Sequence, residues 1–255
     1  MRKVQCLDIG NTTTKIGFFE DDKICQLKQI KTENLISESE KFIDLISKEN
    51  GDLCYCSVVP DAEKFILKAL HRFEGSIHAV SPIFCAGIPI SYHNKKEIGS
   101  DRIANAIAAY YTLPLPAVVI DLGTATTFDI VTKDGGYEGG IILPGPQGFL
   151  DFLNENTALL PKVELSEERS MESPYGKNTK DAMLVGVSLG FKSMINALIE
   201  NLKNYLKKEH GDTPTFAICG GSSINLDFNN SILKENLTLI GLFLAYEFHC
   251  KEKDL

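Results

Sequence analysis

The sequence predicts an α/β protein built from two similar halves, and three observations lead to this fold class. The phrase LDIGNTTT at residues 7–14 returns as IDLGTATT at residues 120–127, so that Asp121 follows Asp8 by 113 residues. Strand and helix patterns alternate along much of the chain, which is typical of a sheet covered by helices. A chain of 255 residues, 44% of them hydrophobic, can bury one large core or two small ones. The repeat favours two.

The first half begins with strand patterns on both sides of a tight turn at Gly10 and Asn11, and a polar turn then leads into a third strand. Helix patterns follow in alternation with short apolar runs such as LCYCSVV. The segment SESEKFIDLISKE is amphipathic behind a serine-rich start, as expected of a helix. The predicted elements are strands at 3–8, 14–19, 24–30, 53–59 and 77–80, and helices at 37–49, 61–73 and 100–112.

The prolines of LPLP at 113–116 break the chain and mark the boundary between the halves. The second half opens with the strand pattern AVVIDLGTATTFDIV. We therefore expect one half over residues 1–114 and the other over residues 115–255. The further elements predicted are a glycine-rich turn at 134–140, a helix at about 179–208, a strand at 215–221 and a helix at 237–249.

Composition excludes several classes of protein. The net charge of -8 argues against sequence-independent binding to nucleic acid, which needs a basic surface. The seven cysteines form no CxxC pair and are expected to be reduced, and the five histidines lack the spacing of metal ligands. With no apolar stretch of 18 residues and no signal-peptide pattern, the sequence predicts a cytoplasmic protein that binds no membrane.

The repeated phrase combines a carboxylate with backbone N–H groups. A strand that ends in aspartate and turns through glycine brings both to one point, where the amides can bind phosphate oxygens and the carboxylate can hold the water shell of Mg²⁺. A single DxG is more often an ordinary turn. Two copies, each followed by threonines and each at the head of a similar half, favour phosphate binding.

Five phrases of the chain resemble the type III pantothenate kinases, a family within the superfamily of sugar kinases, heat-shock ATPases and actin. They stand in the family's order and spacing, and the resemblance covers essentially the whole chain. One departure is Lys95, where the family usually has proline. The phrases are DIGNT at 8–12, GSDRIAN at 99–105, DLGTATTFD at 121–129, GGIILPG at 139–145 and GKNT at 176–179.

The resemblance implies two ribonuclease-H-like halves, each with a central mixed sheet, and an active-site cleft between them. The implied activity is ATP-dependent phosphorylation of pantothenate to 4′-phosphopantothenate, the first step of coenzyme A biosynthesis. It also implies Mg²⁺, a monovalent cation (K⁺ or NH₄⁺), and a homodimer whose interface comes mostly from the second half.

The same resemblance implies residue roles. Asp101 is the general base, and Asp121 belongs to the site of the monovalent cation. The residues implied to bind ATP are Asp8, Ile9, Gly10, Asn11, Thr12, Thr13, Thr14, Lys15 and Thr124. Those implied to bind pantothenate are Tyr92, Gly99, Ser100, Asp101, Arg102 and Thr179.

Simpler interpretations stand beside these roles. Ser100 or Asp101 could be only the N-cap of the helix that follows, and Thr179 only the N-cap of the long helix. Asp129, inside a predicted strand, is interpreted as a solvated carboxylate and receives no role. For the whole protein, the alternatives are a non-enzymatic transcription accessory factor and a sugar kinase on the same fold.

Overall fold

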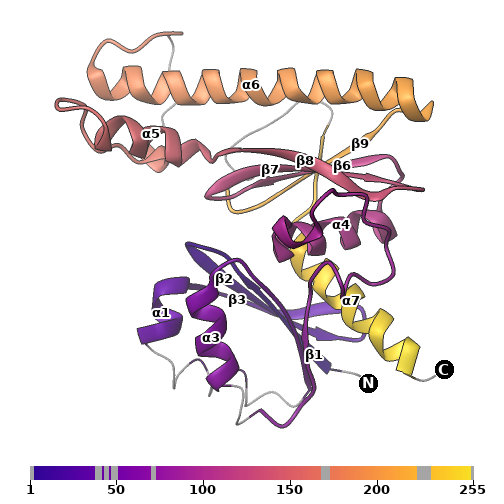
Figure 1. The fold of residues 1–255 in the computed structure, drawn as a ribbon. Coiled ribbons are helices and arrows are strands. Elements are labelled where there is room, and N and C mark those ends of the chain that lie inside the picture. Colours follow the sequence, from indigo (N-terminus) through magenta and orange to yellow (C-terminus); the bar gives the residue numbers. More distant parts are fainter. Residues whose placement is uncertain are drawn as a thin grey trace. The chain divides into compact units, whose positions relative to one another are not determined.

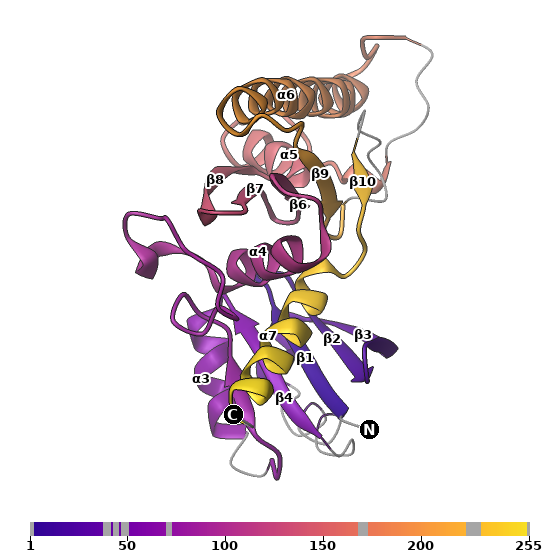
Figure 2. The same ribbon diagram turned by 90° about the vertical axis from the view of Figure 1, so that its right-hand side faces the viewer.

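The described residues form two compact units, each with a five-stranded sheet (Figures 1 and 2). The computed structural model describes residues 3–37, 51–69, 73–167, 173–222 and 231–253, together with Phe42 and Ile46. Unit 1 comprises residues 1–113, 131–139 and 236–255, and unit 2 comprises residues 114–130 and 140–235. The predicted halves, 1–114 and 115–255, remain a prediction about duplication in the sequence.

Unit 1 contains a mixed sheet. In the order β3-β2-β1-β4-β5, the β1–β2 and β2–β3 pairs are antiparallel, whereas β1–β4 and β4–β5 are parallel. Its strands are β1 (Lys3–Ile9), β2 (Thr13–Glu20), β3 (Lys23–Lys31), β4 (Asp52–Ser57) and β5 (Ile77–Ala79). Its helices are α1 (Thr32–Ser37), α3 (Pro60–Ala69), α4 (Ser100–Thr112) and α7 (Leu237–Lys253), with a 3₁₀ turn η2 (Lys95–Glu97).

The sheet of unit 2 repeats this connectivity. Its order is β10-β9-β6-β7-β8, so β6 takes the place of β1, β9 that of β4 and β7 that of β2. The predicted duplicated α/β fold is therefore confirmed. The strands are β6 (Ala117–Leu122), β7 (Ala125–Thr132), β8 (Gly136–Pro144), β9 (Thr215–Cys219) and β10 (Ile232–Leu233). The helices are α5 (Pro146–Glu155) and α6 (Thr179–His210), with a 3₁₀ turn η3 (Leu165–Glu167).

The two faces of the unit 1 sheet are covered by different helices. Because side chains alternate along a strand, Leu7 and Leu53 point to one face, where they form a core with residues of α1 and α3. Asp8 and Cys56 point to the other face. Helix α7 packs there against β1, β2 and β4, and the ring of Phe19 on β2 stacks on Phe243 of α7 with a centroid distance of 4.7 Å.

Helix α4 is held by α7. Gly241 lies so close to the carbonyl oxygen of Ala104 that a β-carbon at position 241 would collide with it. Thr238 Oγ1 donates a hydrogen bond to Asn105 Oδ1 at 2.9 Å. Leu242 of α7 is fully buried, and burial of such a side chain contributes about 1.5–3 kcal/mol. The start of α4 therefore stands on a rigid support within unit 1.

Most predicted elements are present, with shifted ends. The predicted helices at 100–112, 179–208 and 237–249 are α4, α6 and α7, and the described part of the helix predicted at 61–73 is α3. The helix predicted at 37–49 falls almost entirely outside the described residues. The glycine-rich turn predicted at 134–140 is wrong for its larger part, because residues from Gly136 on belong to strand β8. The sequence reasoning also missed α1, α5 and β10, which are short and follow directly on strands or irregular segments.

Two sequence interpretations are wrong. Asp129 is fully buried in β7, not solvated. In addition, α6 contains an 18-residue window with a mean hydropathy of 1.6, so the chain does hold an apolar stretch of that length. Length and composition alone would allow α6 to cross a membrane, but a core helix of a soluble protein meets the same test. The side chains of Val187, Phe191 and Ile195 belong to the core of unit 2.

Candidate active site

The first turn of the repeated phrase exposes its tip. Asp8 is half-buried near the end of β1, and Asn11 and Thr12 are exposed. The Gly10 N–H donates to the Thr13 carbonyl at 3.1 Å, and a β-carbon on Gly10 would lie only 3.0 Å from the same oxygen. Glycine thus permits the tight turn, and the tip is left with backbone N–H groups that can approach a phosphate.

The other predicted ATP-binding residues of this turn have different surroundings. Ile9 is buried in the core, so it can offer a ligand only its backbone. Thr14 is also buried, and its hydroxyl lies 3.1 Å from that of Thr32, which donates to the Gly10 carbonyl at 2.6 Å. Lys15 pairs with Asp8 across β1 and β2, so both side chains share one face of the sheet.

The second turn repeats the arrangement in unit 2. Asp121 is half-buried near the end of β6, and the Gly123 N–H donates to the Ala125 carbonyl at 3.1 Å. Thr124 is exposed at the tip, and its carbonyl accepts the Gly145 N–H at 2.9 Å. Both phrases therefore form tight turns between two strands, but the second is one residue shorter: three residues separate β1 from β2, whereas two separate β6 from β7.

Glycine also makes room for the carboxylate of Asp121. Gly220 follows β9 with a φ of +97°, which disfavours other residues, and its β-carbon would lie 2.5 Å from Asp121 Oδ1. The sequence reasoning placed residues 219–221 in a predicted strand but did not connect them with Asp121. The connection depends on the parallel pairing of β6 with β9, which sets Asp121 beside Cys219.

A buried thiol lies against Asp8. Cys56 pairs with Asp8 in the parallel register of β1 and β4, and its Sγ donates to Asp8 Oδ1 at 3.6 Å. Burial raises the pKa of the Cys56 thiol well above its usual value, and the negative charges of Asp8 and Asp101 raise it further. The thiol therefore stays neutral beside the Asp8 carboxylate.

The first turn of α4 is fixed to the end of β4. Ser100 Oγ donates to the Ser57 carbonyl at 2.9 Å and accepts the Ser57 N–H at 3.0 Å. The N-cap is Gly99, whose β-carbon would lie 2.5 Å from Asp101 Oδ1. Because Gly99 has no side chain, the Asp101 carboxylate can fold back over it, and it accepts the Arg102 N–H at 2.8 Å.

Ser100 is thus not the N-cap, and Asp101 satisfies one helix N–H through one oxygen. The other carboxylate oxygen does not take part in that bond. A half-buried carboxylate at the positive end of a helix is well placed to accept a proton from an acceptor hydroxyl.

Arg102 is buried beside two tyrosines. Only 7% of Arg102 is exposed, and its guanidinium carbon lies 5.7 Å from the ring centroid of Tyr137. The rings of Tyr92 and Tyr137 are 5.9 Å apart, and Gly139 lies against the ring of Tyr92. The guanidinium over an aromatic face is held in a fixed plane. Tyr137 is a site residue that the sequence reasoning missed.

A glycine also joins the Tyr92 loop to β8. Gly136 has a φ of +62° and lies so close to the Pro89 carbonyl that no β-carbon would fit. The Tyr137 N–H donates to the same carbonyl at 3.0 Å, and the Ser91 N–H donates to the Tyr137 carbonyl at 2.9 Å. Tyr92, Arg102 and Tyr137 are therefore brought together within unit 1.

Thr179 is the first residue of α6 in unit 2 and is exposed. The N-cap of this helix is Asn178, whose Oδ1 accepts the Asp181 N–H at 2.9 Å. The interpretation of Thr179 as an N-cap is therefore wrong, and its hydroxyl is not needed to begin the helix.

The donor set suits a hard cation bound together with phosphate. Among the described residues, no group of three or more His, Cys, Asp or Glu side chains could hold a metal ion. Mg²⁺ needs no such group, because one or two carboxylate oxygens, water and substrate phosphates usually complete its shell. Asp8 beside an exposed turn fits this requirement.

Comparison with known proteins gives a consistent family match. Residues 5–201 match the family model of type III pantothenate kinase. The chain is 38% identical to a type III pantothenate kinase of Methylacidiphilum infernorum over 97% of this chain and 89% of that protein. It is 35% identical to one of Streptomyces griseus over 94% of this chain and 96% of that protein.

Solved structures share the fold at low identity. A protein described as a Baf family transcriptional activator from Campylobacter jejuni matches with a TM-score of 0.60 and 20% identity, over 98% of this chain and 100% of that one. A protein described as an N-acetylmannosamine kinase from Listeria monocytogenes matches with a TM-score of 0.53 and 14% identity, over 98% and 99%. At such identities these matches concern the fold alone.

Proposed function

The chain belongs to the type III pantothenate kinase family, and we infer that it transfers the γ-phosphoryl group of ATP to pantothenate. The product is 4′-phosphopantothenate, and the reaction is the first step of coenzyme A biosynthesis. The observation that carries this function is the family match over residues 5–201, together with 31–38% identity to pantothenate kinases over most of the chain.

Each alternative from the sequence has a counterpart by description among the structures that share the fold. A regulator and a sugar kinase are represented among the structures at 14–20% identity, and a shared fold does not imply a shared function. The half-buried carboxylate of Asp8 beside an exposed glycine turn favours an enzyme, since a regulator has no need of a carboxylate that can hold Mg²⁺ next to a phosphate-binding turn.

The assay that tests the function measures ADP release by purified protein with ATP, Mg²⁺ and either pantothenate or a panel of hexoses. We expect ADP only with pantothenate, and mass spectrometry should detect phosphopantothenate. Activity with a hexose alone would support the sugar kinase, and no activity with any acceptor would support the regulator.

We propose that the two turns of the repeated phrase bind the ATP phosphates. The backbone N–H groups at 10–13 and around Thr124 would bind phosphate oxygens, and Asp8 would hold the water shell of the bound Mg²⁺. The metal, when bound, offsets phosphate charge. Lys15, on the same face of the sheet as Asp8, adds a positive charge near the phosphates.

We propose that Asp101 is the general base. Phosphoryl transfer needs the acceptor hydroxyl of pantothenate in line with the γ-phosphorus, and a group that receives its proton as the new P–O bond forms. The support is geometric: the Asp101 carboxylate lies folded over Gly99, on a helix start fixed by Ser100 to Ser57.

Arg102 is proposed to bind the pantothenate carboxylate through the fork of its guanidinium. Replacement with methionine, which keeps much of the apolar stem, should raise the KM for pantothenate about ten- to hundredfold, the range expected for lost hydrogen bonds to a charged group. The KM for ATP should change little. Steady-state kinetics with each substrate varied would measure both, and Arg102→Lys is the control that keeps the charge but not the fork. An equal rise in both KM values would contradict the assignment.

Asp121 is proposed to bind a monovalent cation. Its half-buried carboxylate stands at the end of β6, next to the exposed tip of the second turn, where a carboxylate oxygen can help to coordinate an ion. Exchange of K⁺ for Na⁺ at constant ionic strength should lower turnover severalfold in the parent protein and should have little further effect in Asp121→Asn. Turnover that is unchanged in potassium-free and ammonium-free buffer would remove this role.

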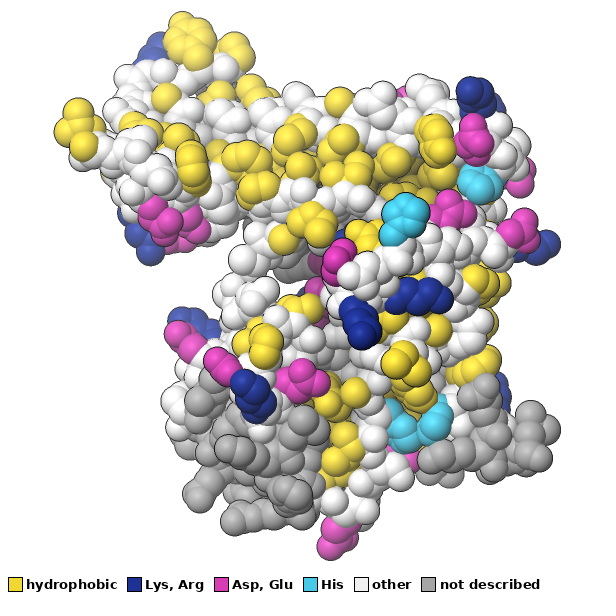
Figure 3. All heavy atoms as spheres, in the orientation of Figure 1, with side chains coloured by type: hydrophobic (Ala, Val, Ile, Leu, Met, Phe, Trp, Pro, Cys, Tyr) yellow, Lys and Arg dark blue, Asp and Glu magenta, His cyan; other side chains and the backbone are white. Residues whose placement is uncertain are grey.

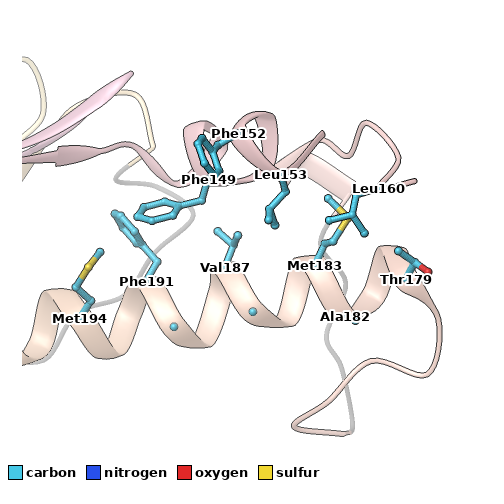
Figure 4. Close-up of a pocket in the computed structure, with 12 residues that line it drawn as sticks. Phe149, Phe152, Leu153, Leu160, Thr179, Ala182, Met183, Val187, Phe191 and Met194 are labelled. Carbon is cyan, nitrogen blue, oxygen red and sulfur yellow. The ribbon is translucent and has the colours of Figure 1, made fainter. Parts of the chain in front are cut away.

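We also propose a homodimer through unit 2. Apolar side chains gather over α5 and α6 (Figure 3), and a cavity of about 640 Å³ lies between these helices. Phe149 and Leu153 of α5 point toward Val187 and Phe191 of α6 (Figure 4). Phe152 remains 62% exposed and Leu189 51% exposed. Such a surface is typical of an interface between copies.

An exposed stripe of small residues on α6, of which Ala182, Gly186 and Gly190 also line this cavity, would admit a second helix closely. Small residues recur there in steps of three or four positions, and β-carbons at Gly186 and Gly190 would meet nothing within 4 Å. This surface accounts for an apolar helix of which only a third of the most apolar window is buried. The stripe consists of Ala182, Gly186, Gly190, Ser193 and Ala197.

Gly186→Leu tests the dimer without disturbing the fold of one copy, because the new side chain enters open space. Light scattering after size exclusion should give twice the chain mass for the parent protein and the mass of one chain for the variant. Glu209→Leu adds the same side chain near the end of α6 and should stay dimeric. A variant Gly186→Leu that remains dimeric would place the interface elsewhere.

We also propose that this soluble enzyme is located in the cytoplasm.

A further inference from the structure

In unit 1, the thiol of Cys56 makes a hydrogen bond with Asp8 that the proposed mechanism does not use. Cys56 Sγ donates to Asp8 Oδ1 at 3.6 Å, and only 1% of Cys56 is exposed. The pairing is fixed by the backbone, since Asp8 and Cys56 are direct partners in the parallel register of β1 and β4. The second unit repeats it, because Asp121 and Cys219 are partners in the parallel register of β6 and β9.

The hydrogen bond from Cys56 affects the orientation of the Asp8 carboxylate. A carboxylate on a short side chain can rotate, and each of its two oxygens can face the turn. A donor on Oδ1 restricts this rotation and so fixes the direction in which the carboxylate faces a cation's water shell. A thiol adds no charge beside Asp8 and Asp101, whereas a carboxylate at position 56 would repel both.

We propose that Cys56 is a positioning residue for Asp8, whose hydrogen bond sets the orientation of the carboxylate that holds Mg²⁺. This inference rests on the proposed role of Asp8. Cys56 itself touches neither substrate. Its effect should therefore appear in the dependence on Mg²⁺ and not in the KM for pantothenate.

Two substitutions separate the hydrogen bond from packing. Cys56→Ala removes the donor with little change in volume, and Cys56→Ser restores a donor of similar size. In Cys56→Ala the Mg²⁺ concentration for half-maximal activity should rise about three- to tenfold, the range of one hydrogen bond. Calorimetry should show that the gain in ATP affinity on adding Mg²⁺ shrinks by the same factor. Cys56→Ser should return both values to near those of the parent.

The matched control is Cys54→Ala, two residues earlier on the same face of β4 and also fully buried. It should lower the melting temperature about as much as Cys56→Ala and leave the Mg²⁺ dependence unchanged. If Cys56→Ala and Cys56→Ser alter only the melting temperature, Cys56 is a packing residue and the inference is wrong.

One experiment distinguishes failure of the Cys56 inference from failure of the proposed phosphate and Mg²⁺ role of the first turn. Asp8→Asn measured in the same calorimetric experiment should abolish most of the Mg²⁺-dependent gain in ATP affinity. If Asp8→Asn leaves the Mg²⁺-dependent gain in ATP affinity unchanged, the proposed role of Asp8 is wrong, and the proposed role of Cys56 is then wrong as well. If Asp8→Asn removes the gain and Cys56→Ala does not, only the positioning role of Cys56 is contradicted.

Discussion

Replacement of Asp101 with asparagine should lower turnover by about two to four orders of magnitude, the usual contribution of a positioned acid or base. The asparagine keeps an Oδ1 atom that can accept the Arg102 N–H, as Asp101 does at 2.8 Å, so the start of α4 should be preserved. The variant loses only the site that receives the proton. Calorimetry should show nearly normal binding of ATP and pantothenate, while the coupled assay shows the loss of turnover.

A matched control is Glu97→Gln, which also removes one negative charge and lies four residues before Asp101. Glu97 is exposed, and Asn94 Nδ2 donates to its Oε1 at 2.7 Å, a bond that glutamine can keep. This variant should retain turnover. Nearly normal turnover in Asp101→Asn, with both substrates bound, would mean that Asp101 only caps a helix N–H and that another group is the base.

Replacement of Asp8 with alanine should lower Mg²⁺-dependent turnover by about two to three orders of magnitude, the scale on which loss of one electrostatic stabiliser acts. The side chain contributes little to the core, because Asp8 is half-buried and the apolar contacts of β1 come from Leu7 and Ile9. Thermal unfolding followed by circular dichroism should therefore show a folded protein. The assay should show that added Mg²⁺ no longer restores the rate.

Asp22→Ala is the control for loss of a carboxylate in the same unit, at the exposed turn between β2 and β3. It should leave the Mg²⁺ dependence as it is. If Asp8→Ala kept the turnover and the Mg²⁺ dependence of the parent, the repeated phrase would be a structural turn and the phosphates would bind elsewhere.

The parts of the site that lie within one phrase could be predicted from the sequence. The aspartate, the glycine and the threonines that follow form a turn by local rules, and the repeat identified two such turns. The GSDR phrase at the start of a helix was predictable for the same reason. What the sequence could not give was the partner of each phrase across the sheet, because the register of a parallel pair depends on residues far apart in the chain.

Cys56 and Tyr137 illustrate this limit. From the sequence, Cys56 is only one of seven cysteines expected to be reduced. The pairing of β1 with β4 shows that it lies beside Asp8. Tyr137 stood in a glycine-rich turn, and only its hydrogen bonds with the loop at 89–91 bring its ring under Arg102. The burial of Asp129 was missed for a related reason. A charged residue within a predicted strand does not indicate which elements pack over that strand, so the burial of its side chain cannot be predicted from the strand alone.

The packing of α7 on α4 sets an order of events during synthesis. A ribosome releases α4 long before it makes Gly241, the residue that admits the carbonyl of Ala104. Nascent unit 1 therefore carries Asp101 on a helix that still lacks its neighbour, and the fully buried Leu242 has not yet been added. Domains generally fold as units once their sequence has emerged. Unit 1 is completed by residues 236–255, so a polypeptide released before them should hold both copies of the repeated phrase but lack the packing that supports Asp101.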